Sequence, residues 1–499
     1  MTANLADLVR RAAQTAPDRP AFLFQGTATT WAQVDAAVDA LARGLLGLGL
    51  EDGDRVALQL GNTPDFPVAY FAVLRAGLVA VPVNTGYTAA ELAHVLGDSG
   101  ARVVVTRPDG AERARSASPG TEHVVVAGAA ATSGPLTLEG LARAGEPVTS
   151  RAGGEDLAVV LYTSGTSGRP RGAMLSHRAL LANLEQTSAI DPPVASHDDV
   201  VLLVLPLFHV YGLNAALGLV AQHAATGVLV ERFDPVETLE DVRRHGVTVL
   251  VGAPPMYVAW SMLPDVGERL AGLRLALSGA APLPKEVLHR LLELSGHHVF
   301  EGYGLTETAP VLTSTLMSEV AKPGSIGRPV PGVELRVVDE SGAAVVEGDP
   351  GEVVARGANL FSGYWPDGAG GPDDDGWWPT GDVAVVDDDG DLHLVDRRRE
   401  MVLVSGFNVY PREVEEVLLT HPGIAEAAVL GIPHPYTGES VKALVVPRPG
   451  ARLTAEDVIE HCAVALARFK CPTAVEVVGS LPHTATGKVS KGQLRELAR

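Results

Sequence analysis

Short apolar runs alternate with amphipathic segments along most of the chain, and this alternation constrains the fold more than any other feature. The apolar runs have the length of single strands, and the segments between them place apolar residues at helical spacing. The runs RVALQL and VAVPVN, for example, flank the helical segment 66–75, and the alternation continues to HHVFEG at 297–302. Strands that alternate with helices form parallel sheets covered on both faces. The sequence therefore predicts an α/β fold.

The alternation changes at about Gly324. Residues 332–345 and 351–357 contain short alternating strands with glycine and aspartate turns, which predict a small barrel or antiparallel sheet. The rest of the chain has its own helical segments, PREVEEVLL and AEDVIEHCAVAL, and its own strands, EAAVLGI and KALVVP. We therefore place a boundary at 396–400, between a large N-terminal domain (1–395) and a small C-terminal domain (401–499).

Composition excludes several classes of protein. The net charge of −21, without a block of lysine and arginine, disfavours nucleic-acid binding. The two cysteines, Cys462 and Cys471, provide neither a disulfide framework nor a metal-ligand set, and the N-terminus lacks the pattern of a secretory signal, so we expect a cytoplasmic protein. Residues 200–230 carry no Asp, Glu, Lys or Arg, but Pro206 and Asn214 interrupt them. We expect a buried strand, turn, helix and strand there, not a membrane span.

The stretch LYTSGTSGRPRG, residues 161–172, concentrates hydroxyl groups, glycines and guanidinium groups between an apolar run and a helix-like segment. Backbone N–H groups in such a turn form a concave site for oxyanions, and Arg169 and Arg171 add positive charge. The stretch differs from the nucleotide-binding pattern G-x-x-x-x-G-K-[ST], because Pro170 stands where glycine is required. On this stretch alone, a polyphosphate site and a flexible surface loop are equally compatible with the residues.

Further motifs follow this loop along the chain: LPLFHVYG, LSGAAPLP, EGYGLTET, WWPTGD, DRRREMVLVSGFNVYPREVEEVL and LPHTATGKVSKGQLR. Together with YTSGTSGRPRG, and in the same order, they resemble the motifs of the adenylate-forming superfamily, which includes acyl-CoA synthetases, luciferases and peptide-synthetase adenylation domains. The resemblance covers essentially the whole chain and is closest to fatty-acyl-CoA synthetases. It implies a large N-terminal domain of two parallel β-sheet and helix lobes plus a small β-barrel, followed by a small, mobile α+β C-terminal domain.

The resemblance also implies the reaction: a carboxylate is joined to AMP from ATP with release of pyrophosphate, and the acyl group then passes to a thiol. ATP, Mg²⁺ and coenzyme A would be the cofactors. Tyr303 would stack on adenine, Thr306 would donate to a phosphate, and Glu307, with Thr163, would hold Mg²⁺. Arg171 stands where the family usually has lysine. The residues that the resemblance places around ATP or coenzyme A are Thr163, Ser164, Gly165, Thr166, Ser167, Gly168, Arg171, Gly279, Ala280, Ala281, Glu301, Gly302, Tyr303, Asp382, Arg397 and Gly406.

The C-terminal motifs imply residues for both steps. Lys488, in TATGKV, corresponds to the lysine that bridges the carboxylate and the α-phosphate, although the paired arginines that often follow are absent here. Asp382 corresponds to the acid that accepts the ribose hydroxyls, with Arg397 beside it. Arg399 corresponds to the hinge about which the C-terminal domain rotates between the steps. Gly406 would leave room for the pantetheine arm.

The acid is only partly specified. The catalytic residues predicted from the resemblance are Lys488, Thr306, Glu307 and His209, and the pocket residues are His209, Tyr211, Gly279 and Gly304. Relatives that activate malonate carry an arginine where this chain has Gly302, and acetate-type relatives have a tryptophan where this motif has Tyr303 and Gly304. An elongated or aromatic monocarboxylate is therefore favoured.

We accordingly predict an AMP-forming acyl-CoA synthetase for a medium- or long-chain fatty acid. Two alternatives stay open: an aryl-CoA ligase of the benzoate or coumarate type, and an acyl-adenylate ligase that loads a carrier protein. A non-catalytic adenylate-binding protein is disfavoured, because both Glu307 and Lys488 are present. The expected partners are the acid, ATP and coenzyme A, without nucleic acid or a transmembrane segment, in a monomer or homodimer.

Overall fold

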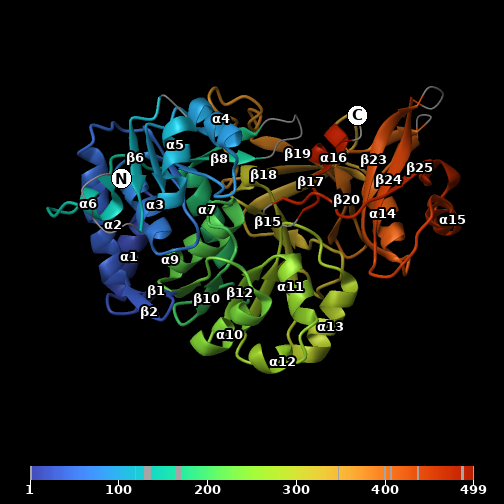
Figure 1. The fold of residues 1–499 in the computed structure, drawn as a ribbon, viewed down its shortest axis with the longest axis horizontal. Helices are drawn as coiled ribbons and strands as arrows, with labels where there is room; N and C mark the ends of the chain where they lie inside the picture. The colour runs from blue at the N-terminus through green and yellow to red at the C-terminus, as the bar shows by residue number, and fades with distance from the viewer. Residues whose placement is uncertain are drawn as a thin grey trace. The chain divides into compact units, whose positions relative to one another are not determined.

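The computed structural model describes residues 3–117, 120–128, 136–163, 170–346, 348–397, 400–404, 407–434, 438–484 and 488–497 (Figure 1). The chain divides into two compact units, Met1–Glu334 with Arg356–Trp378 and Leu335–Ala355 with Pro379–Arg499. The predicted hinge at 396–400 belongs to the second unit in this division. Because Arg399 lies outside the described residues, the hinge and the domain boundary stay predictions.

The first unit contains a nine-stranded sheet in which every neighbouring pair from β14 to β1 is parallel and the pairs beyond them are antiparallel. The strands, in sheet order, are β16 (Arg328–Pro329), β15 (Val311–Ser314), β14 (Val299–Gly304), β13 (Leu275–Ser278), β12 (Val249–Gly252), β10 (Val200–Leu203), β11 (Thr226–Leu229), β1 (Pro20–Phe24) and β2 (Thr27–Thr30). The predicted parallel sheet is therefore confirmed, with short antiparallel strands at both edges.

A second sheet of the same unit has seven strands, all parallel except the edge strand β9. The strands, in sheet order, are β7 (Leu136–Thr137), β6 (His123–Val126), β5 (Val103–Thr106), β3 (Arg55–Gln59), β4 (Val79–Pro82), β8 (Leu157–Thr163) and β9 (Arg171–Ser176). The central strands β3, β4 and β5 are almost wholly buried, as expected for continuous apolar runs in a sheet covered on both faces.

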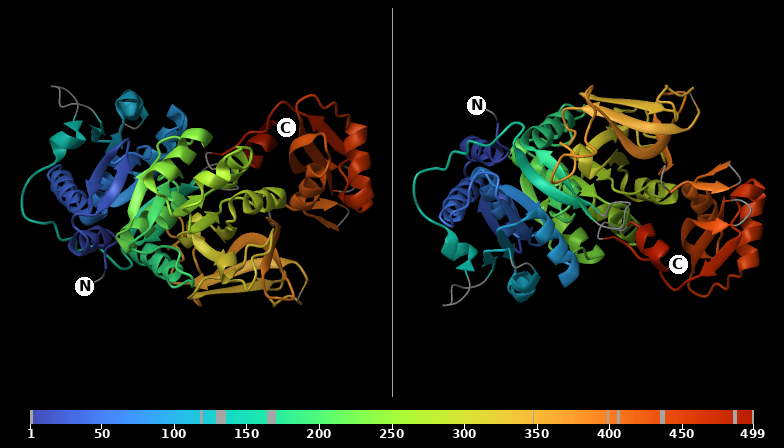
Figure 2. Two further views of the ribbon diagram at one scale, coloured as in Figure 1. Left: turned by 90° about the horizontal axis from the view of Figure 1, so that it is seen from below. Right: turned by 90° about the horizontal axis from the view of Figure 1, so that it is seen from above.

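Helices surround the sheets of the first unit (Figure 2). They are α1 (Asp7–Thr15), α2 (Trp31–Leu46), α3 (Asp65–Arg75), α4 (Ala89–Ser99), α5 (Ala111–Ala117), α6 (Leu138–Leu141), α7 (His177–Ser188), α8 (Val210–Gly212), α9 (Leu219–His223), α10 (Pro235–His245), α11 (Pro254–Ser261), α12 (Val266–Arg269) and α13 (Lys285–Ser295). The shorter helical turns are η1 (Pro108–Gly110), the π-helical η2 (Leu213–Gly218), η3 (Thr306–Thr308) and η4 (Thr315–Met317). Side chains set several ends: Thr88 and Glu91 form a capping box at α4, which ends at the left-handed Gly100.

The apolar stretch 200–230 folds as expected into a strand, a helical segment and a second strand. It forms β10, then the continuous helical run α8, η2 and α9, and then β11. Both strands lie inside the nine-stranded sheet, which explains their lack of charge. In the described part of the chain, no helix is both long enough and apolar enough to cross a membrane.

A four-stranded sheet has most of its residues in the second unit, and β19 and β20 pair antiparallel. Its strands are β17 (Val333–Val338), β18 (Gly351–Gly357), β19 (Trp377–Val386) and β20 (Leu392–Arg397). This half-barrel confirms the small sheet expected after Gly324. The remaining strands are β22 (Phe407–Val409), β21 (Val402–Val404), β24 (Gly438–Pro447), β23 (Ile424–His434) and β25 (Ala474–Val477), with helices α14 (Pro411–Leu419), α15 (Ala455–Ala465) and α16 (Lys491–Leu497) and the short turn η5 (Arg468–Lys470).

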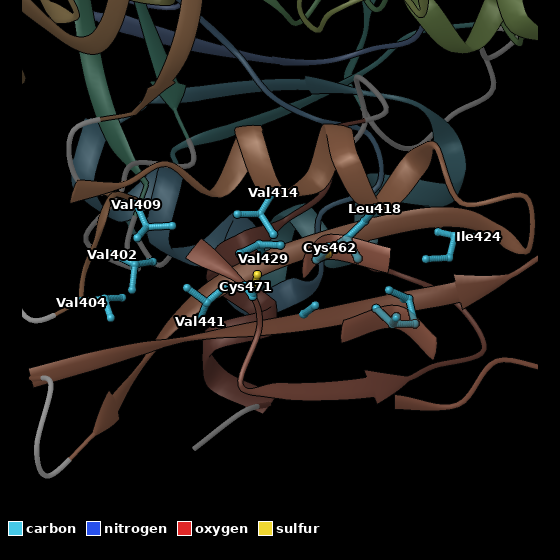
Figure 3. Close-up of a cluster of buried hydrophobic side chains, with 13 residues drawn as sticks. Val402, Val404, Val409, Val414, Leu418, Ile424, Val429, Val441, Cys462 and Cys471 are labelled. Atoms are coloured by element: carbon cyan, nitrogen blue, oxygen red, sulfur yellow. The ribbon is translucent and has the colours of Figure 1, made fainter. Parts of the chain in front are cut away.

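The core of this last sheet is formed mostly by valines beneath α14. Val414 and Leu418 of α14 point towards the sheet, and Cys462 and Cys471 lie among the same buried side chains (Figure 3). Both cysteines are free thiols, and burial raises the pKa of the Cys462 thiol to about 11. Because a thiol with a raised pKa stays protonated and unreactive, these cysteines contribute packing to the core.

Candidate active site

The described residues at the two ends of the glycine-rich stretch belong to two paired strands. Strands β8 and β9 pair antiparallel with Thr163 opposite Arg171, so the two ends of the stretch lie side by side. The helical segment predicted at 177–188 begins at His177 in the structure, and residues 171–176 form β9 before it. Residues 164–169, and with them the predicted nucleotide residues Ser164, Gly165, Thr166, Ser167 and Gly168, lie outside the described part of the chain.

Arg171 leaves this pair of strands towards an aromatic ring. Its guanidinium carbon lies 3.6 Å from the ring centroid of Tyr364, within the range of a cation–π contact. The backbone around Tyr364 is tied to β9, because Met174 N–H donates to Gly363 O (3.0 Å) and Trp365 N–H donates to Gly172 O (2.8 Å). The stretch 361–365 is therefore fixed against the strand that follows the predicted phosphate loop.

Thr306 and Glu307 lie in η3, between β14 and β15, and are only 9% and 8% exposed. The hydroxyl of Tyr364 donates to Glu307 Oε1 at 2.7 Å. The Glu307 carbonyl also accepts from Phe361 N–H at 2.9 Å. The predicted metal carboxylate is therefore a nearly buried group whose orientation is set by a phenol from a distant part of the sequence.

Buried amide side chains hold the backbone of residues 305–311. Asn359 Nδ2 donates to Thr308 O (2.7 Å), Asn214 Nδ2 donates to Ala309 O (2.7 Å), and Asn183 Nδ2 donates to Val311 O (2.8 Å). The three asparagines are at most 1% exposed and come from α7, from η2 and from the segment after β18. Since a buried amide left without partners is unfavourable, this network strongly favours one conformation of the segment.

The end of β14 requires glycine at position 304 but not at position 302. A Cβ on Gly304 would lie 1.7 Å from Pro310 O, whereas a Cβ on Gly302 would lie 3.3 Å from Thr313 O. Glu301, predicted to lie near the nucleotide, turns its carboxylate to Leu283 N–H at 3.0 Å. Tyr303 is 9% exposed. Glu301 thereby links EGYG to the turn after β13, and both segments contain residues predicted to lie around the nucleotide.

The turn after β13 brings two predicted pocket residues together. A Cβ on Gly279 would lie 2.9 Å from the ring of Tyr211, so the ring lies directly on the glycine backbone. Ala280 has a φ of 72°, and a non-glycine residue in this left-handed region marks a strained turn of the kind found at functional sites. His209 caps α8, accepting from Tyr211 N–H at Nδ1 (3.4 Å). The structure therefore places His209, Tyr211 and Gly279 next to one another.

A further tyrosine, which no sequence motif indicated, lies beside this group. Tyr257 of α11 is 1% exposed, and its hydroxyl donates to Leu277 O at 2.6 Å. Its ring would meet a Cβ on Gly252 at 3.0 Å. Burial raises the pKa of Tyr257 well above its ordinary value, so the hydroxyl stays protonated. The two tyrosines pack in the same way: the Tyr257 ring lies on Gly252 at the end of β12, and the Tyr211 ring lies on Gly279 directly after β13.

In the second unit, the strand register brings two predicted nucleotide residues together. Asp382 of β19 pairs with Arg397 of β20, and Asp382 is 6% exposed. The backbone N–H of Asp382 donates to Thr380 Oγ1 at 3.1 Å, and Thr380 Oγ1 donates to Val353 O at 2.9 Å. The side chain of Arg397 and the residues Arg399 and Gly406 lie outside the described part of the chain.

Lys488 is exposed and lies just before α16. Its backbone N–H donates to Thr484 Oγ1 at 3.1 Å, and its carbonyl accepts from Thr484 N–H at 2.7 Å. Three residues later, Lys491 Nζ lies 3.1 Å from Glu400 Oε2 and 2.8 Å from Glu415 Oε1. These three charged side chains are 13–17% exposed, so α16 is anchored to the residue that ends the predicted hinge.

Comparisons with known proteins agree with both parts of the chain. A family model described as AMP-binding enzyme matches residues 9–365, and one described as AMP-binding enzyme C-terminal domain matches residues 413–488. A long-chain-fatty-acid–CoA ligase from Escherichia coli O157:H7 is 34% identical over 99% of this chain and 95% of its own length. A feruloyl-CoA synthase from Amycolatopsis sp is 38% identical over 97% of each chain.

The fold leads to the same group of enzymes. The crystal structure of ATP-bound MatB from Rhodopseudomonas palustris matches 99% of each chain with a TM-score of 0.89 at 34% sequence identity. The match confirms the predicted superfamily and the predicted enzyme class at their coarser level. The chain belongs to the AMP-binding enzyme family, within its AMP-forming carboxylate–CoA ligases.

Proposed function

We propose that this enzyme activates an elongated monocarboxylate, with a medium- or long-chain fatty acid as the first candidate, and transfers it to coenzyme A. The observation that carries this proposal is that Gly302 stands where malonate-activating relatives have an arginine, and that the other predicted pocket residues Tyr211, Gly279 and Gly304 are uncharged as well. A second carboxylate on the acid would be desolvated there without a partner. The long-chain-fatty-acid–CoA ligase that matches 99% of this chain supports the aliphatic candidate.

An aromatic acid is the second candidate. The Tyr211 ring lies against Gly279 and offers a flat wall on which an aryl ring can stack. The feruloyl-CoA synthase is 38% identical over almost the whole chain. Both candidates are monocarboxylates that extend away from the reacting carboxyl group.

In the proposed first step, the acid carboxylate displaces pyrophosphate at the α-phosphorus, so positioning and charge neutralisation lower the barrier. Thr163 and Arg171 would hold the outer phosphates from strands β8 and β9, Thr306 would donate to a phosphate, and Lys488 would bridge the acid and the α-phosphate. Asp382 would accept hydrogen bonds from both ribose hydroxyls.

The residues present fit Mg²⁺. In the described ranges, no three His, Cys, Asp or Glu residues gather into a complete protein cage. Mg²⁺ is usually held by one or two carboxylates plus substrate phosphates, and Glu307 supplies a nearly buried carboxylate of this kind. When bound, Mg²⁺ would neutralise charge on the phosphates. Glu307 would hold the cation with ATP, and Tyr364 would orient Glu307.

The second step would bring the thiol to the acyl carbon after pyrophosphate has left. We assign the hinge for this change to 396–400 around Arg399, and the pantetheine channel to Gly406. The matches of two separate family models, to 9–365 and 413–488, support a division near this place.

Pyrophosphate release across an acid panel tests the proposal. Saturated fatty acids of increasing length, benzoates and cinnamates would be compared with ATP and Mg²⁺, with and without coenzyme A, in the wild type and in Lys488→Ala. We expect release that depends on one acid class, rises with coenzyme A and collapses in Lys488→Ala. Lys285→Ala, an exposed lysine of α13, is the matched control. Turnover of short dicarboxylates in preference to all these acids would overturn the assignment.

A further inference from the structure

Tyr364 lies between a cation and a carboxylate that the predicted chemistry needs separately. The guanidinium of Arg171 packs on its ring face at 3.6 Å, and its hydroxyl donates to Glu307 Oε1 at 2.7 Å. Arg171 follows the predicted phosphate loop, and Glu307 is the predicted metal carboxylate. One side chain thus contacts both halves of the predicted ATP-phosphate site.

The identity of residue 171 agrees with this contact. Arginine has a planar, delocalised cation that stacks on aromatic faces, whereas lysine carries a compact, strongly hydrated ammonium. Arg171 takes the place of the usual lysine and lies on the Tyr364 ring in this geometry. The exchange therefore places the cation against a ring and leaves its edge free to donate to phosphate oxygens.

The chain also fixes Tyr364 from several sides. Its backbone N–H donates to Ala369 O at 3.0 Å, and it forms an isolated antiparallel bridge with Ala173 of β9. The ring of Phe361 meets the Tyr364 ring edge-on, with centroids 5.0 Å apart. Because Phe361 N–H also donates to Glu307 O, the same short stretch holds both the tyrosine and the backbone of the carboxylate.

We propose that Tyr364 is a positioning residue that holds Glu307 for a Mg²⁺–ATP complex and keeps Arg171 from neutralising it. A nearby arginine and glutamate would otherwise pair bidentately, and each would then be less available to phosphate or metal. The ring face of Tyr364 holds the guanidinium of Arg171, and the hydroxyl of Tyr364 holds the carboxylate of Glu307. The hydrogen bond occupies Oε1 and leaves Oε2 for the cation. This inference rests on the proposed function.

The test is the binding of α,β-methylene-ATP, which cannot release pyrophosphate, to the full-length protein by isothermal titration calorimetry with and without Mg²⁺. Tyr364→Phe keeps the ring under Arg171 and removes only the hydroxyl. We expect the Mg²⁺-dependent gain in affinity to fall about ten- to hundredfold, as for the loss of a hydrogen bond to a charged group, with unchanged affinity in the absence of Mg²⁺. Tyr364→Leu also removes the ring and should weaken the Mg²⁺-free affinity about two- to fivefold.

Trp365→Phe is the matched control. It removes a neighbouring side-chain hydrogen bond, from Trp365 Nε1 to Asp98 O at 3.0 Å, that does not reach Glu307. This variant should keep the full Mg²⁺-dependent gain. If Tyr364→Phe keeps it as well, Tyr364 is not the positioning residue and only this inference fails. If the wild type shows no Mg²⁺-dependent gain, the metal assignment to Glu307 fails together with it.

Discussion

Residues 305–311 and residues 488–497 both carry side chains predicted to act on ATP, but the chain holds them in opposite ways. Thr306 and Glu307 are nearly buried, and asparagines from three separate elements bind the backbone around them. Lys488 is exposed, and its backbone is held by two hydrogen bonds to Thr484. Buried hydrogen bonds hold the first region in one conformation, and we call it the rigid region. The second region is anchored mainly by the ion pairs of Lys491.

The difference agrees with the roles proposed for Glu307 and Lys488. A carboxylate that must hold a cation at one place gains from a fixed environment, because no reorganisation is then needed during the reaction. A lysine needed in only one of two steps gains from an exposed place outside the core, where local rearrangement requires little energy. The following predictions test this contrast, from the largest expected effect to the smallest.

Glu307→Gln removes the charge from the rigid region and keeps the shape of the side chain. We expect acyl-adenylate formation to fall about a hundredfold or more, the usual loss for one group that stabilises transition-state charge. Pyrophosphate release at saturating acid measures it. Glu286→Gln, on the exposed side of α13, is the control and should leave the rate unchanged. A rate within threefold of wild type would remove Glu307 from the phosphate site.

Gly304→Ala tests how firmly residues 305–311 are seated. Its Cβ would meet Pro310 O at 1.7 Å, so the backbone must move, and we expect a loss of about 3 kcal/mol in the free energy of unfolding. Gly302→Ala, with 3.3 Å to Thr313 O, should cost less than about 1 kcal/mol. Urea unfolding of both variants gives the comparison. Equal losses would show that the segment adapts and is not rigid.

Lys491→Met tests the anchor of the second region. It leaves Glu400 and Glu415 facing each other, largely buried and without their shared cation, so we expect a loss of about 1–2 kcal/mol, confined to the second unit. Lys442→Met breaks a more exposed pair with Glu476 and should cost less than about 1 kcal/mol. Hydrogen exchange of α16 amides measures the local effect. Unchanged protection of α16 would show that the ion pairs do not hold the tail.

Acid should lower the stability of the first unit through His177, which begins α7 and contacts Leu5. Burial lowers the pKa of His177 from 6.5 to about 4, and its Nδ1 accepts from Leu5 N–H, so the folded protein holds it neutral. Its contribution to stability is present above pH 6.5 and is lost as the pH falls towards 4. The free energy of unfolding should therefore fall by about 1 kcal/mol between pH 7 and pH 5.5. His177→Gln should flatten this part of the stability profile, and parallel profiles for the two proteins would contradict the assignment.

Much of the fold follows from the sequence pattern. The helix at 177–188 was predicted with the bounds that the structure shows, because Ser176 caps it and its apolar spacing is regular. Strand β9 was not predicted, since RGAMLS is short and begins with Arg and Gly, and its pairing with β8 across the loop decides its conformation. Periodicity reports local burial, so it locates strands in the centre of a sheet better than strands at an edge.

The candidate site was predicted through its motifs, but the residues that hold it were not. Asn214 and Asn359 were not predicted to hold the site, yet both are buried and donate to backbone carbonyls 95 and 51 residues away in the sequence. Tyr364 lies in a loop, and only the tertiary structure brings it between Arg171 and Glu307. Their partners are set by tertiary folding, which leaves no periodic signal along the chain.

The most direct test of the central contrast is the second half-reaction alone. A purified acyl-adenylate of the preferred acid would be supplied with coenzyme A to the wild type and to Lys488→Ala, and thioester formation would be followed by rapid quench. If Lys488 serves only the first step, the variant should form thioester within about threefold of the wild-type rate while its overall reaction stays impaired by about a hundredfold. An equal loss in both assays would contradict the account, because Lys488 would then be needed by both steps or by the fold.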